Sequence, residues 1–316
     1  MTGGRATAGT LTFGGCDLIL VLVGDDVERR TYMISELKEL FKYKGLLKQL
    51  VVRDLKVRYK NSVLGFFWSL ANPLIQVATI TIIIKYVLRL QISNYSALVL
   101  VGYLPWMFFQ MALLDSSQVI LLHRDLLRKV YFPRELLPLS VAVANLIHFL
   151  LALVVFFAYL MVYWLFLRGA PIMVTALWLP VLVGLQFLLI VGLTFFVSCL
   201  NVFYEDVKYM LTALLGVVFY VTPIMYPAEL VYRSLPEAWW GLAYKLYLLN
   251  PLNMLTEAYR KTLLPPFKDM EFKGAEVTSL PLDYALLGVT AVICLAIAVA
   301  GYKFFNSRKW VFAERV

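Results

Sequence analysis

The fold is decided by the stretch FLLALVVFFAYLM at residues 149–161, which contains no charged side chain. A second run without charge, VATITIII, occupies residues 77–84. Strands of a membrane β-barrel alternate apolar and polar residues with a period of two. These runs are continuous instead, and a bilayer core requires about 20 apolar residues per spanning helix. They therefore predict transmembrane α-helices.

The composition of the 316-residue chain also indicates that the protein lies in a lipid bilayer. Apolar residues make up 61% and charged residues 16%, and the mean hydropathy is +0.78, whereas a soluble domain carries about 25% charged residues. The net charge of +9, from 29 Lys and Arg against 20 Asp and Glu, is typical of cytosolic loops near anionic headgroups, so no nucleic acid is expected. Cys16, Cys199 and Cys294 are scattered, which argues against a disulfide framework or a CxxC metal site.

Six transmembrane helices are predicted, at residues 63–88, 98–119, 136–166, 174–200, 209–225 and 282–305. The two short loops assigned to the outside hold only Lys85, Arg89 and Arg168, whereas the loops on the other side are rich in Lys and Arg. Because positive charge collects on the cytosolic side, both termini are expected to be cytosolic. The protein is therefore a multi-pass protein of an all-α class.

The N-terminal part differs from the rest. Residues 1–32 lack the order of a signal peptide and are interpreted as an extension from an early start codon, with Met33 as the true beginning, or as a disordered tail. Residues 33–62 are predicted to form a cytosolic amphipathic helix in the membrane interface. Packing of that helix on a soluble partner is the alternative.

The segment at residues 226–281 is too apolar for a solvated loop. The sequence WWGLAYKLYLL at residues 239–249 precedes the breaking pair Asn250-Pro251, and a further apolar stretch follows at 252–264. We expect two short re-entrant helices here, dipping into the outer leaflet with their backbone shielded by neighbouring spans.

No catalytic or nucleotide-binding motif is present. The sequence has no GxxxxGK[ST] loop. Neither of its two histidines, His123 and His148, belongs to a recognisable catalytic motif. If ATP drives this protein, another polypeptide must bind it. The loop at 122–135 is the best contact surface for such a partner, because polar and apolar side chains mix in a short helix that Pro133 ends. A solvated turn is the alternative.

Five motifs in chain order resemble one family. They are RYKNSVLG at 58–65 with WSLANPL at 68–74, GYLPW at 102–106 with Phe108-Phe109, KVYFPRE at 129–135, PIMYP at 223–227, and LNPL at 249–252 with EAYR at 257–260. Together they resemble the membrane subunits of polysaccharide ABC exporters, the O-antigen, capsule and teichoic-acid group. The chain departs from the expected Arg-Asp after the fourth span, where it has Tyr204-Glu205-Asp206.

The resemblance implies a homodimer in the bacterial inner membrane, joined to two ATP-binding cassette subunits. ATP and Mg would bind in those partners, and this chain would bind no cofactor or metal and catalyse no reaction. The cargo would be an undecaprenyl-type lipid-linked polysaccharide. The residues expected to contact the ATPase are Arg124, Asp125, Leu126, Leu127, Arg128, Lys129 and Tyr131.

Two further sets of residues fit such a cargo. A pyrophosphate cannot enter hydrocarbon unpaired, so Arg53, Lys56, Arg58 and Lys60 are predicted to receive the lipid headgroup. Anchoring to anionic lipids is the alternative. Aromatic rings match the apolar faces of sugars, so the predicted channel lining is Trp68, Tyr103, Trp106, Phe108 and Phe109. An interfacial aromatic belt is the alternative.

Two other functions remain possible from the residues. One is a membrane sugar or acyl transferase acting on a lipid-linked donor, for which the nearest acidic pairs are Asp269/Glu271 and Glu205/Asp206. The other is a drug exporter of the same superfamily. A neighbouring gene with a GxxxxGK[ST] motif would favour the polysaccharide exporter.

Overall fold

The structure is a computed structural model that describes residues 42–60, 66–87, 94–167, 174–233, 236, 239–266, 270–272 and 275–312. The chain divides into two compact units, residues 1–46 and 47–316. Residues 42–46 are the described part of the first unit, so the predicted extension at 1–32 lies outside the described residues. The architecture below is that of the second unit.

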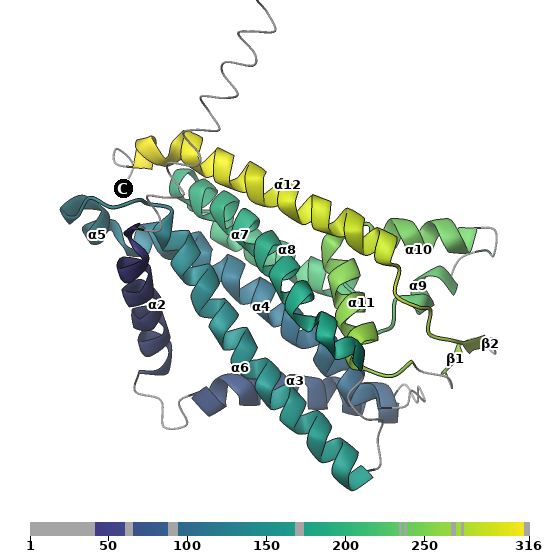
Figure 1. The fold of residues 1–316 in the computed structure, drawn as a ribbon. Coiled ribbons are helices and arrows are strands. Elements are labelled where there is room, and N and C mark those ends of the chain that lie inside the picture. The colour runs from purple at the N-terminus through teal and green to yellow at the C-terminus, as the bar shows by residue number, and fades with distance from the viewer. Residues whose placement is uncertain are drawn as a thin grey trace, which may run out of the picture. The chain divides into compact units, whose positions relative to one another are not determined.

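Helices dominate the described chain (Figure 1). In order they are α2 (Lys44–Tyr59), α3 (Phe66–Ile82), the π-helical turn η1 (Ile83–Val87), α4 (Tyr95–Leu122), α5 (Arg124–Lys129), α6 (Leu136–Leu167), the 3-10 turn η2 (Val174–Trp178), α7 (Leu179–Phe203), α8 (Val207–Val221), α9 (Glu229–Arg233), α10 (Trp240–Leu248), α11 (Pro251–Leu263), α12 (Tyr284–Arg308) and the 3-10 turn η4 (Lys309–Val311). Two three-residue strands, β1 (Met270–Phe272) and β2 (Ala275–Val277), pair antiparallel between α11 and α12.

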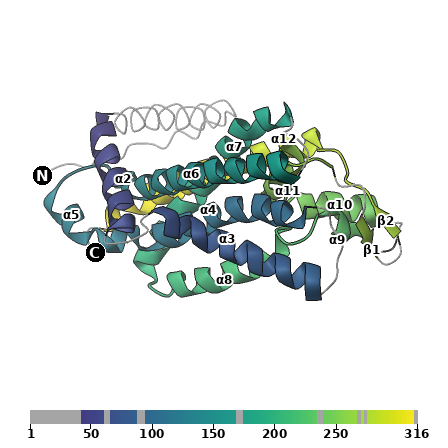
Figure 2. The same cartoon turned by 90° about the horizontal axis from the view of Figure 1, so that it is seen from below.

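Helix α4 lies at the centre of the packing. It contacts α3, α6, α7, α8 and α11, and in Figure 2 it runs between α6 on one side and α8 on the other. Its most apolar stretch is 78% buried, against 22% for α12, which lies at the periphery. The Phe108 ring of α4 stacks on Phe149 of α6 with 5.0 Å between centroids, and Gln186 of α7 donates to the carbonyl of Pro105 in α4 at 2.7 Å. Helix α4 is therefore the element on which the others pack.

Helices α7 and α12 approach each other closely at two glycines, Gly192 and Gly301. A Cβ atom built on Gly192 would lie 2.6 Å from the carbonyl oxygen of Ile297 and 2.7 Å from the Cα of Ala298, and one built on Gly301 would overlap the backbone of Gly192. Glycine is needed at both positions because no larger side chain fits between the two backbones.

Replacing Gly192 or Gly301 by alanine is expected to destabilise the protein by about 1–3 kcal/mol, because the added methyl group forces the two helices apart. The measurement is the thermal unfolding midpoint of the purified protein in detergent. Gly184→Ala in α7 and Gly288→Ala in α12 are matched controls, since a Cβ at either position meets nothing within 4 Å. Equal midpoints for all four variants would contradict this account of the α7–α12 contact.

Within the described residues, four helices are long and apolar enough to cross a membrane: Tyr95–Leu122, Leu136–Phe166, Thr175–Phe203 and Tyr284–Val311. They correspond to the predicted spans at 98–119, 136–166, 174–200 and 282–305, which confirms a multi-pass, helical membrane protein.

The other two predicted spans correspond to shorter helices. The span at 209–225 is α8, which has 15 residues and a length of about 22 Å, less than the hydrocarbon core of about 30 Å. It ends at Val221 because Thr222 precedes Pro223 and takes an extended conformation with ψ 137°, as residues before proline do. The span at 63–88 is α3 with η1. A count of six spans therefore stays a prediction.

Two predicted helices occur in the segment at 226–281. Helix α10 ends before Asn250, whose side chain caps α11 by accepting from the amide of Leu252 at 3.1 Å. Proline at 251 occupies the first helical turn, where its missing N–H costs nothing. The structure adds α9 and the β1–β2 pair, which the sequence did not predict. Whether α10 and α11 dip into a leaflet stays a prediction.

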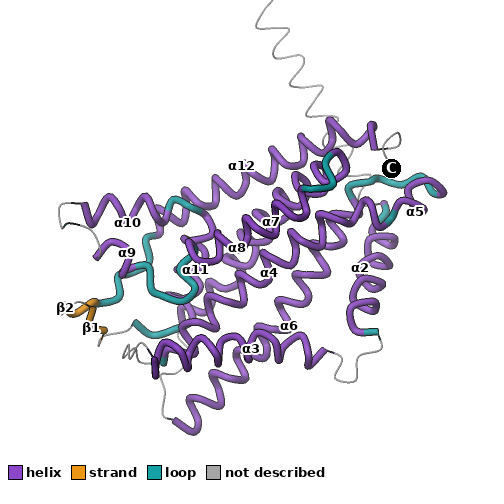
Figure 3. The backbone as a smooth tube through the Cα atoms, turned by 180° about the vertical axis from the view of Figure 1, so that it is seen from behind, coloured by secondary structure: helices purple, strands orange, loops and turns teal. Residues whose placement is uncertain are grey.

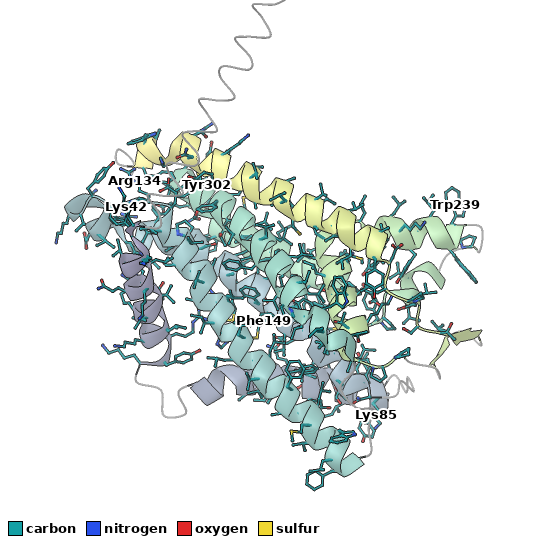
Figure 4. The ribbon with its side chains drawn as sticks, in the orientation of Figure 1. Lys42, Lys85, Arg134, Phe149, Trp239 and Tyr302 are labelled. Carbon is teal, nitrogen blue, oxygen red and sulfur yellow. The ribbon has the colours of Figure 1, made fainter. Side chains whose placement is uncertain are left out.

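The two ends of the helices carry the residues predicted for opposite sides of the membrane. Figure 4 shows Arg134 and Tyr302 at one end and Lys85 and Trp239 at the other, with Phe149 between them. This arrangement agrees with the prediction that the loop at 122–135 and the segment at 226–281 lie on opposite sides.

Candidate functional site

Helix α5 is a short, exposed helix that follows α4 almost without a break. Helix α4 ends at Leu122, His123 leaves the helical conformation, and α5 begins at Arg124. No side chain of α5 is buried, and Tyr131, just beyond it, is 85% exposed. Asp125 in the first turn and Lys129 in the last turn complement the helix dipole. All the residues predicted to contact an ATPase therefore lie on one accessible segment.

The far end of this segment is anchored to the end of α12. Phe132 is buried, Glu135 is 3% exposed and pairs with Lys309 at 2.7 Å, and Arg134 donates to the carbonyl of Lys309. Figure 3 shows α5 and the C-terminal end of α12 at the same end of the molecule. A force applied to α5 would therefore be transmitted to α12 and α6 as well as to α4.

Helix α2 is bound to α4 and α6 by a polar network. Arg58 pairs with Asp115 of α4 at 2.5 Å and donates to Asn145 of α6 at 3.0 Å. The amide of Asn145 donates to Asp115 at 3.0 Å, which closes the triad. The Tyr59 hydroxyl lies 2.8 Å from Nδ1 of His148, also in α6. These contacts tie the end of α2 to two long helices.

A second contact joins α2 to the start of α5. Arg53 hydrogen-bonds Nε2 of His123, the residue that separates α4 from α5, and pairs with Asp54 at 2.8 Å. Arginine has no acceptor, so Nε2 of His123 is the acceptor and Nδ1 carries the proton. That Nδ1 lies 2.7 Å from the carbonyl of Val119, to which it donates. A displacement of α2 would therefore move His123 and the first turn of α5.

A cavity of about 510 Å³, here called the α2 cavity, lies between α2, α4 and α6. Seven polar side chains line it together with apolar ones: Arg53, Asp54, Arg58, Asp115, Gln118, His123 and Asn145. The two arginines face two aspartates, so the formal charge of the wall is balanced. The cavity can therefore hold a polar group without presenting a large unpaired charge.

The structure divides the four residues predicted to receive a headgroup. Arg53 and Arg58 line the α2 cavity and are already paired, whereas Lys56 and Lys60 are exposed. Sequence reasoning missed Asp115, although an acid inside a predicted span is costly and marks a functional position. Nothing in the sequence marked Asn145 as a partner of Asp115 and Arg58, because these contacts form between different helices.

Four of the five aromatic residues predicted to line a channel are buried in α4: Tyr103, Trp106, Phe108 and Phe109. The side chain of Trp68 lies outside the described residues. Tyr103 and Trp106 share a face, since their rings lie 6.3 and 5.6 Å from Phe219 of α8, and the Tyr103 hydroxyl donates to Gln76 of α3. Phe108 faces α6 instead. The lining role stays a prediction, and Tyr103 and Trp106 both pack against α8.

The acidic pairs considered for a transferase do not form a catalytic group in the described residues. Glu205 and Asp206 are exposed in the turn between α7 and α8, Asp269 lies outside the described residues, and so does the side chain of Glu271. No cluster of three His, Cys, Asp or Glu side chains able to hold a metal occurs in the described part of the chain.

A cluster of four buried charges lies around α11, at the end of the helices opposite α5. Glu229, Glu257, Arg260 and Lys261 are 0–8% exposed. Arg260 pairs with Glu257 at 3.0 Å, and Lys261 lies 3.4 Å from both Glu229 and Glu257. Burial raises the pKa of Glu229, and the Glu257 carboxylate raises it further, while Lys261 acts in the opposite direction. We call these four residues the α11 charge cluster.

The sequence profile of the family described as ABC-2 type transporter matches residues 45–264, more than two thirds of the chain. The chain belongs to the ABC-2 type transporter family. The matched range begins in α2, contains α5 and ends just after α11, so both polar regions described above lie in the family's domain. Membership identifies the chain as the membrane subunit of an ABC transporter, not an enzyme, and implies a partner that binds ATP.

Individual relatives match most of the chain. O-antigen export system permease protein RfbA from Myxococcus xanthus is 33% identical over 288 residues, which cover 90% of this chain and 100% of that protein. Two proteins of the same name from Klebsiella pneumoniae are each 30% identical over 271 residues, or 85% of this chain and 94% of theirs.

Proposed function

We propose that this ABC-2 family member is the membrane subunit of an exporter for lipid-linked, O-antigen-like polysaccharide. The observation that carries the proposal is the match with proteins named O-antigen export system permeases along nearly their whole length. In this proposal the chain binds no cofactor, and ATP with Mg binds in a separate subunit.

The architecture proposed for the assembly has six spans, with α3 and α8 as spans one and five. Two copies form a homodimer in the inner membrane with both termini cytosolic, and α10 and α11 are re-entrant helices on the outside. Residues 33–62 form the interfacial helix and 63–316 the transmembrane domain. The opposite positions of Arg134 and Trp239 in Figure 4 support this topology.

The energy of ATP hydrolysis enters through α5 in this mechanism. Closure of the ATP-binding subunits pushes on the exposed α5 segment, and the spans respond because contacts with the partner differ between the two states. Exposed Lys56 and Lys60 attract the phosphate-bearing headgroup first, and it enters the α2 cavity by replacing Asp54 and Asp115 as the partner of Arg53 and Arg58. Because Arg53 contacts His123, occupation of the cavity is sensed at the start of α5.

Deletion of the gene is expected to abolish surface polysaccharide and to trap lipid-linked polymer on the cytosolic side of the membrane. The reason is that a charged headgroup does not cross hydrocarbon unaided. The measurement is the amount of polymer accessible to a probe outside intact cells compared with the amount exposed after lysis. Complementation with the intact gene is the control.

Normal surface polymer in the deletion strain would contradict the proposed function. A drug-type exporter would instead leave the polymer unchanged and increase sensitivity to lipophilic compounds. A membrane transferase would change the structure of the polymer made inside the cell, and not its location.

A further inference from the structure

A second cavity, of about 350 Å³, lies beside the α11 charge cluster. Its wall comes from η2, from the C-terminal part of α11 and from the chain leading into α12. We call it the α11 cavity. It lies at the first turn of α12, whereas α5 lies near the other end of that helix (Figure 1), and the 25 residues of α12 span about 38 Å. It is therefore separate from the α2 cavity.

One part of the wall is an aromatic surface that remains accessible. Trp178 is 41% exposed and Tyr284 is 57% exposed, and their rings pack against each other at 5.6 Å between centroids. Partly exposed rings offer a flat apolar face with a polar edge. Such a surface matches the C–H face of a sugar ring.

Another part of the wall contains buried polar atoms that lack hydrogen-bond partners among the described residues. Glu257 and Arg260 both line the cavity and are 1% and 4% exposed. Oε1 of Glu257 and Nε of Arg260 accept or donate no hydrogen bond within the described part of the chain. Buried polar atoms are normally paired, so Nε of Arg260 offers a donor to a ligand, and Oε1 of Glu257 offers an acceptor that it shares with the Lys261 ammonium 3.4 Å away.

The balance of charge selects the class of that ligand. The α11 charge cluster contains two acids and two bases, and each charge lies within 3.4 Å of an opposite one. An ionic ligand would therefore gain little from it. A hydroxyl group both donates and accepts, so it can pair with a carboxylate oxygen and a guanidinium N–H at once.

We propose that the α11 cavity is a sugar-binding subsite that takes a neutral glycosyl unit of the exported polymer, with Trp178 and Tyr284 as its platform and Glu257 and Arg260 as its polar groups. The proposal rests on the proposed function for the class of cargo. The volume of the α11 cavity is at the small end of the range for ligand pockets, and it suits a short segment of a polysaccharide chain. At the end predicted to lie outside, such a subsite holds the emerging polymer and opposes its backward movement.

The test uses the complete transporter, with its ATP-binding subunit, in lipid nanodiscs. The probe is the oligosaccharide released by mild acid from the strain's own surface polysaccharide, and its Kd is measured by titration calorimetry. Trp178→Ala and Tyr284→Ala are each expected to raise the Kd about tenfold, which corresponds to a loss of about 1.4 kcal/mol of binding free energy. Trp178→Phe keeps a ring and should retain most of the affinity.

Leu177→Ala is the matched control, because Leu177 is adjacent to Trp178, is 83% exposed and does not line the cavity. The unfolding midpoint of each variant shows that it is folded. Unchanged affinity in Trp178→Ala and Tyr284→Ala would overturn the proposed subsite. The same conclusion would follow if the oligosaccharide did not bind a wild-type transporter that exports polymer in cells. Either result would leave the proposed function intact.

Two further outcomes separate the possibilities. Equal binding of glycerol 3-phosphate would assign the α11 cavity to lipid headgroups and overturn the proposal for a sugar. Normal surface polymer in the deletion strain would instead remove the proposed function itself.

Discussion

Arg260→Met is expected to destabilise the protein by about 3–5 kcal/mol, because it breaks a buried ion pair and leaves the α11 charge cluster with one unbalanced negative charge. The Arg260 guanidinium is 4% exposed and pairs with Glu257 at 3.0 Å. It also donates to the carbonyls of Pro223, Ile224 and Tyr226 at 2.7–3.3 Å. Methionine fills a similar volume but leaves the carboxylate and these carbonyls unsatisfied. The connection between α8 and α9 would lose its attachment to α11.

The measurement is the unfolding midpoint of the purified protein in detergent, together with the yield of monodisperse protein. Arg124→Met is the matched control, because Arg124 is exposed on α5 and its replacement should leave the midpoint unchanged. If Arg260→Met unfolds at the same temperature as the control, the α11 charge cluster does not stabilise the fold.

Charge reversal on α5, as Asp125→Lys or Arg128→Glu, is expected to reduce export by about tenfold or more while ATP hydrolysis continues. Both side chains are exposed, and reversing a charge at a docked surface places like charges together, which costs several kcal/mol. The fold should persist, since neither side chain is buried in the described chain. Loss of export while ATP hydrolysis continues is the pattern of an uncoupled transporter.

The measurement compares ATP hydrolysis with polymer transport in vesicles that contain both subunits. Lys303→Glu is the control, because Lys303 is an exposed base on α12 outside the α5 segment. If both α5 variants transport as much polymer per ATP hydrolysed as the wild type, the energy of ATP hydrolysis enters at another surface. An equal loss in Lys303→Glu would point to a general effect of charge.

In the proposed mechanism, the polar contacts of α2 with His123, Asp115 and Asn145 connect the α5 segment to a second part of the protein, the wall of the α2 cavity. His123 accepts from Arg53 of α2 and donates to the last turns of α4, so it joins the wall of the α2 cavity to the helix that an ATP-binding subunit would contact. Asp115 of the Arg58 ion pair is 41% exposed, and solvent screens such pairs to about 1 kcal/mol or less. The network is thus weak enough to rearrange during a transport cycle.

The sequence predicted the helices well where the signal was local. The run at 149–161 lies within α6, and the spans at 98–119, 174–200 and 282–305 agree with α4, α7 and α12 within a few residues. Hydropathy is a property of consecutive residues, and a helix satisfies its own backbone hydrogen bonds in a membrane. Helix α5 could be predicted for the same reason, since Pro133 and the mixture of charged and apolar residues lie within one short stretch.

The sequence was less informative where packing decides the outcome. It predicted that Arg53 and Arg58 receive a lipid headgroup but did not indicate their partners within the protein, since Arg53 hydrogen-bonds His123 at the end of α4 and Arg58 pairs with Asp115 of α4. It treated Tyr103, Trp106, Phe108 and Phe109 as one lining, yet a helix distributes these positions over different faces.

The amino-acid sequence by itself determined that this protein lies in a lipid bilayer. It also determined the long helices, the exposed segment between the second and third predicted spans, and the family to which the protein belongs. Only the tertiary structure decided which charges meet: Arg58 with Asp115 across 57 positions, Glu229 with Lys261, and the four carbonyl and carboxylate partners of Arg260. The reason is physical. A span is defined by its own hydropathy, whereas an ion pair exists only when two helices pack in one register, and that register depends on side chains from every helix they touch.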